Sequence, residues 1–163
     1  MVYTIKKGRH RAWPLRLGLA FRRRAFRRIV SFLNYEYHIE GEDMADTNKL
    51  FGIGFLWNHH KESARVGWRW DPEKRMVLLS AYCYVGGARI IESLAWIDPA
   101  KPATISIYVE TWAYFFHVIQ DGIVVGYHSV KRFHRKKWSF PLGLYFGGNQ
   151  AAPERIRVDM KKL

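Results

Sequence analysis

The chain of 163 residues has one cysteine, Cys83, and no long apolar run. A single cysteine excludes an intrachain disulfide and gives no indication of a secreted, disulfide-held framework. No segment approaches the roughly 20 consecutive apolar residues that a membrane-spanning helix needs. Residues 1–15 also lack an apolar segment followed by a cleavage site, so we expect no signal peptide and a cytoplasmic or virion-associated location.

Acidic residues are scarce, and residues 1–35 contain none. The chain has 27 Lys and Arg against 14 Asp and Glu, which gives a net charge of +13. Such a charge attracts nucleic acid, uronate-rich polysaccharide or an acidic protein surface, although a solvated basic face is the plainer alternative. The predicted contacts for such a partner are Arg22, Arg23, Arg24, Arg27 and Arg28. No nucleic-acid-binding motif accompanies them, so any binding of nucleic acid would be non-specific.

Apolar residues make up 48% of the chain and charged residues 25%, as in an ordinary globular domain. The aromatic share of 16% favours strands, because aromatic side chains fit a pleated surface. Side chains alternate in residues 15–22 and 29–39 as in half-buried strands. Further strands are predicted at 49–57, 63–70, 76–85, 89–96, 104–110, 113–120, 123–129 and 155–161. Turn sequences separate several of them, namely Asp71-Pro72, Gly86-Gly87, Asp98-Pro99 and Asp121-Gly122.

Many short strands at this spacing predict one all-β domain, a jelly-roll sandwich of two antiparallel sheets. Within it, we expect residues 1–28 to form a basic N-terminal arm with the first strands, and residues 29–163 to form the sandwich. Residues 17–33 also allow a basic amphipathic helix, since apolar side chains recur there every four residues. The strand interpretation is preferred because the rest of the chain is predicted to be β. The longest irregular stretches are expected at 40–48 and 130–141.

One segment, NHHKESARVGWRW, combines two histidines, three cations and two tryptophans within thirteen residues. As a strand, residues 63–70 would send Arg65 and Arg69 to a polar face and the tryptophans to a core-like face. His59 and His60 lie in the loop before this strand. These four side chains are candidate ligand-binding residues, although the solvated outer face of an antiparallel sheet is an equally good explanation.

Three further side chains complete the candidate binding set, namely Tyr84, Tyr145 and Asn149. Gly147 and Gly148 favour a tight turn before Asn149. Tyr145 and Asn149 would then lie at the rim of a groove, where a ring stacks on a sugar and an amide bonds to its hydroxyls. The simpler alternative is that this turn only delivers the last strand.

The sequence predicts neither a metal ion nor a cofactor. Adjacent histidines point in opposite directions on an extended chain, and no Cys or His has the short spacing of a zinc site. Asp43, Asp46 and Asn48 could offer oxygen ligands, but their spacing does not match a calcium loop.

Four segments, 46–52, 59–70, 81–90 and 144–158, resemble a group of small bacterial and phage-associated proteins. Those proteins resemble concanavalin-type jelly rolls, the fold of legume lectins, laminin-G modules and some alginate-type polysaccharide lyases. The resemblance therefore implies a concanavalin-like fold, and it names no activity. The group's usual ending, APHD, is replaced here by Ala152-Pro153-Glu154-Arg155, so no role of that histidine can be transferred. The signature motifs of the lyases are absent, which argues against catalysis.

Three functions remain open from the sequence. The first is a non-catalytic, lectin-like module that recognises carbohydrate or another acidic surface. The second is a structural component of a phage virion or other large assembly, which grips neighbours with its basic N-terminal arm. The third is a polysaccharide lyase acting on uronate polymers, for which the missing export signal is unfavourable. In such a lyase, Arg65 would neutralise the uronate carboxylate. The α-proton would be removed by His59, His60, Tyr82, Tyr84 or Tyr145.

Overall fold

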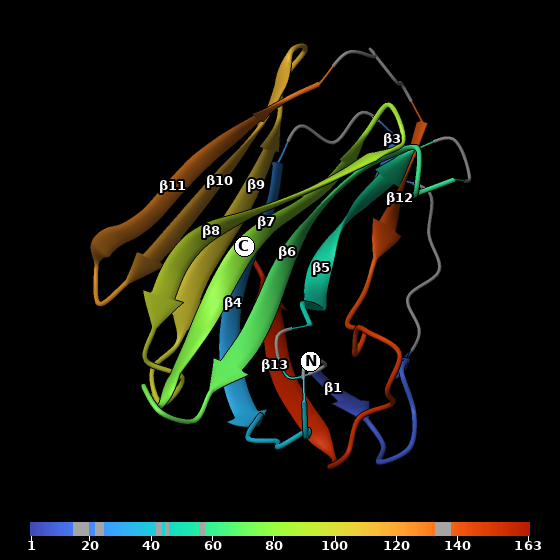
Figure 1. The fold of residues 1–163 in the computed structure, drawn as a ribbon. Coiled ribbons are helices and arrows are strands. Elements are labelled where there is room, and N and C mark those ends of the chain that lie inside the picture. Colours follow the sequence, from blue (N-terminus) through green and yellow to red (C-terminus); the bar gives the residue numbers. More distant parts are fainter. Residues whose placement is uncertain (15–19, 22–24, 42–43, 45, 56–57, 133–137) are drawn as a thin grey trace.

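The computed structural model describes residues 1–14, 20–21, 25–41, 44, 46–55, 58–132 and 138–163. Two antiparallel sheets lie face to face in this part of the chain, with the core between them (Figure 1). The predicted all-β sandwich of two antiparallel sheets is therefore confirmed. No helix within these ranges is long and apolar enough to cross a membrane.

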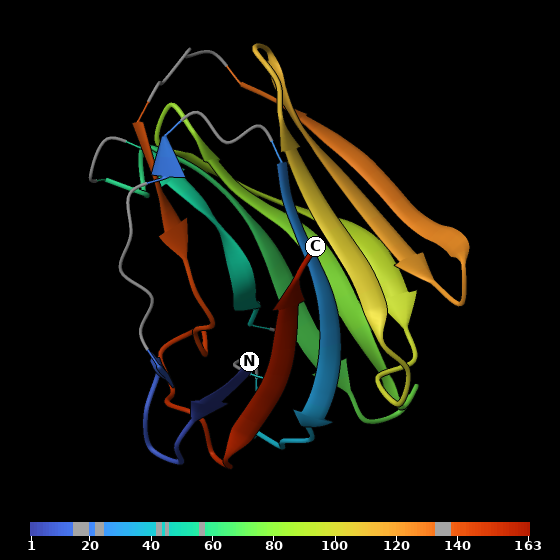
Figure 2. The same cartoon turned by 180° about the vertical axis from the view of Figure 1, so that it is seen from behind.

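The larger sheet has seven strands in the order β11-β10-β9-β4-β13-β1-β2. Figure 2 shows this sheet from its own side, with β4, β9 and β13 in its middle. The bounds of its strands are β1 (Val2–Ile5), β2 (Ala12–Trp13), β4 (Ala25–Asn34), β9 (Ala103–Val109), β10 (Ala113–Gln120), β11 (Ile123–Lys131) and β13 (Ile156–Lys162). Strands that are far apart in the sequence are thus neighbours in the sheet, because β13 pairs with β1 on one side and with β4 on the other.

The smaller sheet has six strands in the order β3-β12-β5-β6-β7-β8. Its strands are β3 (Ala20–Phe21), β12 (Trp138–Leu142), β5 (Asn48–Phe55), β6 (Glu62–Asp71), β7 (Met76–Val85) and β8 (Ala88–Ile97). The strands β5 to β8 follow one another in the chain and in the sheet, so local hairpins build this half of the sandwich.

Trp68 of β6 packs at the centre of the core and is fully buried. Its ring lies 5.4 Å from that of Phe32 on β4 and 5.9 Å from that of Tyr37, so it joins the two sheets. Tyr37 meets Phe146 edge-on at 5.1 Å. Edge-to-face pairs at these separations are the favoured arrangement of aromatic rings. Part of the high aromatic content of the chain therefore packs in the core between the sheets.

The predicted hairpin turns are confirmed by their backbone geometry. Gly86 and Gly87 have φ of 60° and 89°, and Asp121 and Gly122 have φ of 52° and 78°. Positive φ at both central residues gives the twist that a two-residue hairpin needs. In the turn after β6, the Asp71 carboxylate accepts two backbone N–H bonds of 3.0 Å. The strands predicted from residue 49 onward are all present, with bounds that differ by at most two residues.

Several predictions for the first 40 residues are wrong. The helix predicted as an alternative for residues 17–33 is absent from the described part, because β4 pairs with β13 and β9 on its two sides. The strand predicted over 29–39 ends at Asn34, and the following residues are irregular although Tyr37 and Ile39 are buried. Of the strand predicted over 15–22, residues 20–21 form β3, which confirms that part, and residues 15–19 and 22 lie outside the described residues.

Three strands were not expected from the sequence, namely β1, β2 and β12. Strand β1 pairs with β13, so residues 2–5 are part of the larger sheet. The boundary expected after residue 28 falls inside β4. Residues 130–141 were expected to be irregular, but β11 continues to Lys131 and β12 begins at Trp138 and pairs with β5. Residues 133–137 lie outside the described residues.

A buried charged cluster links the two sheets near one end of β6. The Nε atom of Arg132 lies 3.6 Å from Oε1 of Glu62, and both side chains are almost fully buried. The Tyr114 hydroxyl donates a hydrogen bond to the same carboxylate oxygen. The Arg132 guanidinium also lies 4.8 Å from the ring centroids of Phe55 and Tyr114. Burial raises the pKa of Tyr114, so the phenol keeps the proton that it donates.

Replacing Arg132 with methionine should lower the free energy of unfolding by about 3 kcal/mol or more, because it leaves the Glu62 carboxylate buried without its cation. Denaturant unfolding of the wild type and the variant measures this change. Arg27→Met is the matched control, since Arg27 is an exposed arginine of β4. Equal losses in the two variants would contradict a special contribution of the buried pair.

Candidate functional site

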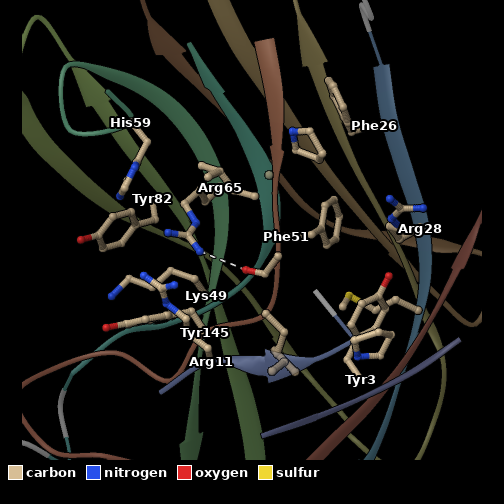
Figure 3. A pocket seen from close by; sticks show the side chains of 18 of the residues that line it. Tyr3, Arg11, Phe26, Arg28, Lys49, Phe51, His59, Arg65, Tyr82 and Tyr145 are labelled. Atoms are coloured by element: carbon tan, nitrogen blue, oxygen red, sulfur yellow. Dashed lines mark hydrogen bonds between the residues drawn. The ribbon is translucent and has the colours of Figure 1, made fainter. Parts of the chain in front are cut away.

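A cavity of about 900 Å³ opens between β5–β7 of the smaller sheet, β1, β2, β4 and β13 of the larger sheet, and the segment 141–148. Figure 3 shows His59, Tyr82, Arg65, Lys49 and Tyr145 on one side of it. We call this side, together with Arg11, His60 and Tyr84, the cationic side of the cavity. The opposite side carries Tyr3, Phe26, Arg28 and Phe51.

Strand register places Arg65 in the middle of the cationic side. On β6, Ala64 and Val66 point into the core, so Arg65 points to the outer face of the sheet. It lies opposite Gly52 of β5 and Tyr82 of β7. A Cβ atom at position 52 would come within 2.2 Å of the Ala64 carbonyl oxygen and 2.6 Å of the Arg65 Cα. Glycine at position 52 therefore makes room for the arginine.

Arg65 is a buried cation without a carboxylate partner. The side chain is only 8% exposed, and it forms no ion pair with any acidic residue in the described part of the chain. Its Nη2 atom donates to the Gly143 carbonyl at 3.0 Å, whereas its buried Nε–H has no hydrogen-bond partner among the described residues. Burial lowers the pKa of Arg65 to about 10, so the guanidinium is still charged at neutral pH.

Lys49 adds a second cation beside Arg65. Its ammonium group lies 4.8 Å from the Tyr82 ring centroid and 5.8 Å from that of Tyr145. Burial, followed by the charge of Arg65, lowers the pKa of Lys49 to about 8, although Asp46 acts in the opposite direction. The two cations thus repel each other in a partly desolvated site, and an anion between them would relieve this repulsion.

The two histidines lie together at one end of the cationic side. Their ring centroids are 4.1 Å apart, and the His60 ring meets Tyr84 edge-on at 5.1 Å. The expectation that they point in opposite directions is wrong, because they lie in a turn and not on an extended strand. Burial, and then the charges of His60 and Arg65, lower the pKa of His59, which favours its neutral form. In the residues that the structure describes, no three His, Cys, Asp or Glu side chains are arranged to hold a metal ion.

Tyr145 reaches the cavity through a short isolated bridge to β5. The backbone N–H of Tyr145 donates to the Lys49 carbonyl, and the Lys49 N–H donates back, both at 2.9 Å. The Tyr145 ring stacks on His10 with centroids 5.5 Å apart. The segment that carries Tyr145 therefore closes one wall of the cavity beside Lys49.

The structure brings five of the seven candidate binding residues to the cavity and leaves two elsewhere. Those at the cavity are His59, His60, Arg65, Tyr84 and Tyr145. Arg69 is four residues beyond Arg65 and points to the same face of β6, but it does not line the cavity. Asn149 is exposed and does not line it either.

The last two arginines of the predicted basic cluster, Arg27 and Arg28, lie on β4. Arg22, Arg23 and Arg24 lie outside the described residues. Arg27 is exposed on β4, whereas Arg28 lines the cavity with its guanidinium 5.9 Å from the Phe51 ring centroid. Adjacent residues of a strand point to opposite faces, so Arg27 and Arg28 lie on opposite faces of β4.

Sequence analysis missed Lys49, Gly52, Arg11 and Gly143. One signal for this region was present, because glycine occupies alternate positions 52 and 54 of a predicted strand. Two glycines on one face indicate a surface that another group approaches closely. The contacts of Arg11 and Gly143 depend on the folding of distant segments, so no local sequence pattern predicts them.

Comparisons with known proteins relate the fold to solved structures. No protein-family model matches the chain, and no curated protein matches it. An alginate lyase from Klebsiella pneumoniae superposes with a TM-score of 0.63 at 10% identity, over 85% of this chain and 59% of that one. The chain thus spans 59% of the length of that lyase.

Two further structures cover nearly all of this chain. A functionally unknown protein from Saccharomyces cerevisiae has a TM-score of 0.60 at 11% identity, over 99% of this chain and 88% of that one. The alginate lyase AlyC3 has a TM-score of 0.58 at 13% identity, over 99% and 72%. These similarities confirm the jelly-roll sandwich. The resemblance to phage-associated proteins remains a prediction.

Gly52→Ala should lower the free energy of unfolding by about 1–3 kcal/mol, because the added methyl group has no room beside the backbone of β6. Denaturant unfolding measures the loss. Gly143→Ala is the matched control, since a Cβ at that position meets no atom within 4 Å. If Gly52→Ala proved as stable as Gly143→Ala, the close contact between β5 and β6 at Arg65 would be refuted.

Proposed function

We propose that the cavity binds an acidic carbohydrate, with the carboxylate of a uronate residue held by Arg65. The observation that carries this proposal is the buried guanidinium without a carboxylate partner. Burying an unpaired charge is costly unless another charge compensates it. An anionic ligand supplies that charge, and the guanidinium of Arg65, which lines the cavity, can donate hydrogen bonds to it.

The aromatic side chains around Arg65 suit a sugar ring. Tyr82, Tyr84 and Tyr145 line the same side of the cavity, where their rings can pack against the apolar face of a sugar. Burial, followed by the neighbouring Tyr84, raises the pKa of Tyr82 to about 12, so its hydroxyl stays a neutral donor. The volume of about 900 Å³ lies within the usual range for small-ligand sites and would hold a short oligosaccharide.

The similar structures support the choice of ligand class. Two of them are alginate lyases, and one structure of AlyC3 contains dimannuronate. Alginate is a uronate polymer, and its carboxylates match the cations Arg65 and Lys49 of the cavity. The similar structures support the proposal only through their shared fold. The ligand class is argued from the charged residues of the cavity, because a fold alone does not determine function.

A lyase acting on uronate polymers is the second candidate. The observation that favours it is the lowered pKa of His59, which leaves the imidazole able to accept a proton beside Arg65. Non-catalytic recognition is preferred because the signature motifs of the lyases are absent from the sequence. The assembly hypothesis stays a prediction, since the contacts of the described residues neither favour nor oppose it.

Arg65→Gln should weaken binding of oligomannuronate by about tenfold or more, because it removes the charge opposite the carboxylate. Isothermal titration calorimetry of the wild type and the variant measures the affinity, with neutral manno-oligosaccharides of equal length as the control ligand. Arg27→Gln is the control variant, since it changes the net charge equally on an exposed strand face.

Equal affinity of Arg65→Gln and Arg27→Gln for oligomannuronate would mean that only the net charge attracts the ligand.

Incubation with polymannuronate, followed by ultraviolet absorbance, separates the binding module from the lyase. Accumulation of an unsaturated product that is lost in His59→Ala would favour the lyase over the binding module.

The affinity for oligomannuronate should fall as pH rises through about 8, where Lys49 loses its charge. The sugar carboxylate stays ionised over this range, and Arg65 keeps its proton because its pKa is about 10. A bound anion raises the pKa of Lys49, so the decline begins at or above this value. Titrations at several pH values measure it, and Lys49→Met should remove the pH dependence. An unchanged slope in Lys49→Met would exclude Lys49 as its origin.

A further inference from the structure

Strands β9, β10 and β11 lie side by side in the larger sheet (Figure 2), and aromatic side chains gather on their outer face. On β10, Tyr114, Phe116 and Val118 are fully buried in the core. Because side chains alternate along a strand, Phe115 and His117 point away from the core and toward solvent. This face is outside the site described above.

Four ring contacts join these side chains into one surface. The His117 ring centroid lies 4.8 Å from that of Tyr127 on β11 and 5.5 Å from that of Tyr108 on β9. The Phe115 ring lies 6.2 Å from Tyr127 and 5.2 Å from Trp112, which belongs to the connection between β9 and β10. We call these five residues the aromatic face. Tyr127 is 56% exposed and Trp112 59%, so a ligand from solution can reach their rings.

Exposed cations flank the aromatic face. The strand register aligns four residues in one row across β11, β10, β9 and β4, namely Tyr127, His117, Ser106 and Arg27. The row spans about 14 Å, because neighbouring strands lie about 4.8 Å apart. Lys131 is a second exposed cation and lies on β11 two positions beyond Ser129, the partner of Phe115.

Acidic side chains are absent from this part of the sheet. Strands β4, β9, β10 and β11, all of which the structure describes, contain no Asp or Glu. In the connecting turns, Asp121 is paired with Lys101 at 2.7 Å, and Glu110 is exposed two residues before Trp112. The charged side chains of the four strands are thus all cationic, and such a surface attracts an anion.

We propose that the aromatic face binds single-stranded nucleic acid, with bases stacked on its rings and phosphates held by Arg27 and Lys131. Proteins that bind single strands without sequence preference combine a positive surface with exposed aromatic rings. Outward aromatic side chains of a four-stranded sheet also stack bases in one class of RNA-binding domain. The row of about 14 Å has room for about three or four nucleotides, at roughly 3.4 Å or more each.

The polar groups of this surface favour a base over a sugar ring as the bound group. Several hydroxyls of a sugar need several hydrogen-bonding side chains, such as carboxylates and amides. The four strands contain two amide side chains, and both are bonded to the backbone. Asn34 donates to the Arg155 carbonyl, and Gln120 donates to the Asp98 carbonyl. Stacking of a base needs only an exposed ring, which Tyr127 offers.

The aromatic face is separate from the cavity. None of its five residues lines the cavity, and Arg65 points to the outer face of the other sheet. Arg27 also points away from the cavity, which Arg28 lines. Arg27→Gln should therefore weaken binding of nucleic acid and leave binding of oligomannuronate unchanged, so the two ligands test the two surfaces independently.

Fluorescence anisotropy with labelled oligothymidylate of about twelve nucleotides tests the proposal on the full chain. An abasic strand of equal length is the control ligand, because it carries the same phosphates and no bases. The wild type should bind oligothymidylate about tenfold or more tightly than the abasic strand. The affinity for both strands should fall steeply as salt is added, since both displace counterions.

Tyr127→Ala should weaken binding of oligothymidylate by about tenfold and leave binding of the abasic strand unchanged, because it removes a ring and no charge. Tyr127→Phe keeps the ring and should bind as the wild type does. Ile123→Ala is the matched control, since Ile123 is 66% exposed on the same strand and has no ring. Circular dichroism verifies that the variants keep the β fold.

Lys131→Gln should weaken binding of both strands and reduce the slope of log affinity against log salt concentration by about one, because one phosphate contact is lost. Lys61→Gln is its control, since Lys61 is an exposed lysine in the turn before β6. Equal changes in the two variants would contradict a phosphate contact at Lys131, because the net charge alone would then attract the strand.

Equal affinity of the wild type for oligothymidylate and the abasic strand would overturn the proposal, because no base would then be stacked. Loss of oligomannuronate binding in Tyr127→Ala, with oligothymidylate binding unchanged, would also overturn it and assign the aromatic face to an acidic carbohydrate. Loss of oligothymidylate binding in Tyr127→Ala, with oligomannuronate binding unchanged, would support it even if Arg65→Gln had no effect on oligomannuronate.

Discussion

The antiparallel pairing of β6 with β5 and β7 determines both the core and the candidate site. Successive side chains of a strand point to opposite faces, so Trp68 enters the core while Arg65 faces the cavity. The register on both sides sets the surroundings of the guanidinium, with Gly52 across from it on β5 and Tyr82 on β7. A shift of one residue would exchange the two faces, which would place Arg65 in the core. The charge of the cavity is thus a consequence of strand register.

Local alternation was enough to predict β5 to β11 and β13, because period two is visible within a single strand. It failed for β1 and β12, which are strands only through pairing with distant parts of the chain. Residues 17–33 carry both a helical and a strand pattern, and neighbours on both sides of β4 select the strand. Tyr37 and Ile39 are buried outside any strand, so alternation assigned them to the wrong element.

The candidate site was predictable to the extent that it lies on one strand and its preceding turn. Arg65, His59 and His60 come from a single segment whose polar face the sequence reveals. Lys49 and Tyr145 meet only because a loop from the end of the chain bridges to β5. Such contacts depend on tertiary structure, and so does the absence of a carboxylate partner for Arg65 in the described residues. The overall fold is shared with enzymes and with a protein of unknown function, so the cavity is the more specific observation.

The bond from Arg65 Nη2 to the Gly143 carbonyl has a consequence for recognition. An arginine on a surface samples many rotamers, and holding it in one of them costs conformational entropy when a ligand arrives. Here one edge of the planar guanidinium is already tied to the backbone, and the side chain is enclosed by its neighbours. The loss of rotational freedom has therefore occurred during folding, so the proposed binding of an anion would not have to order this side chain again.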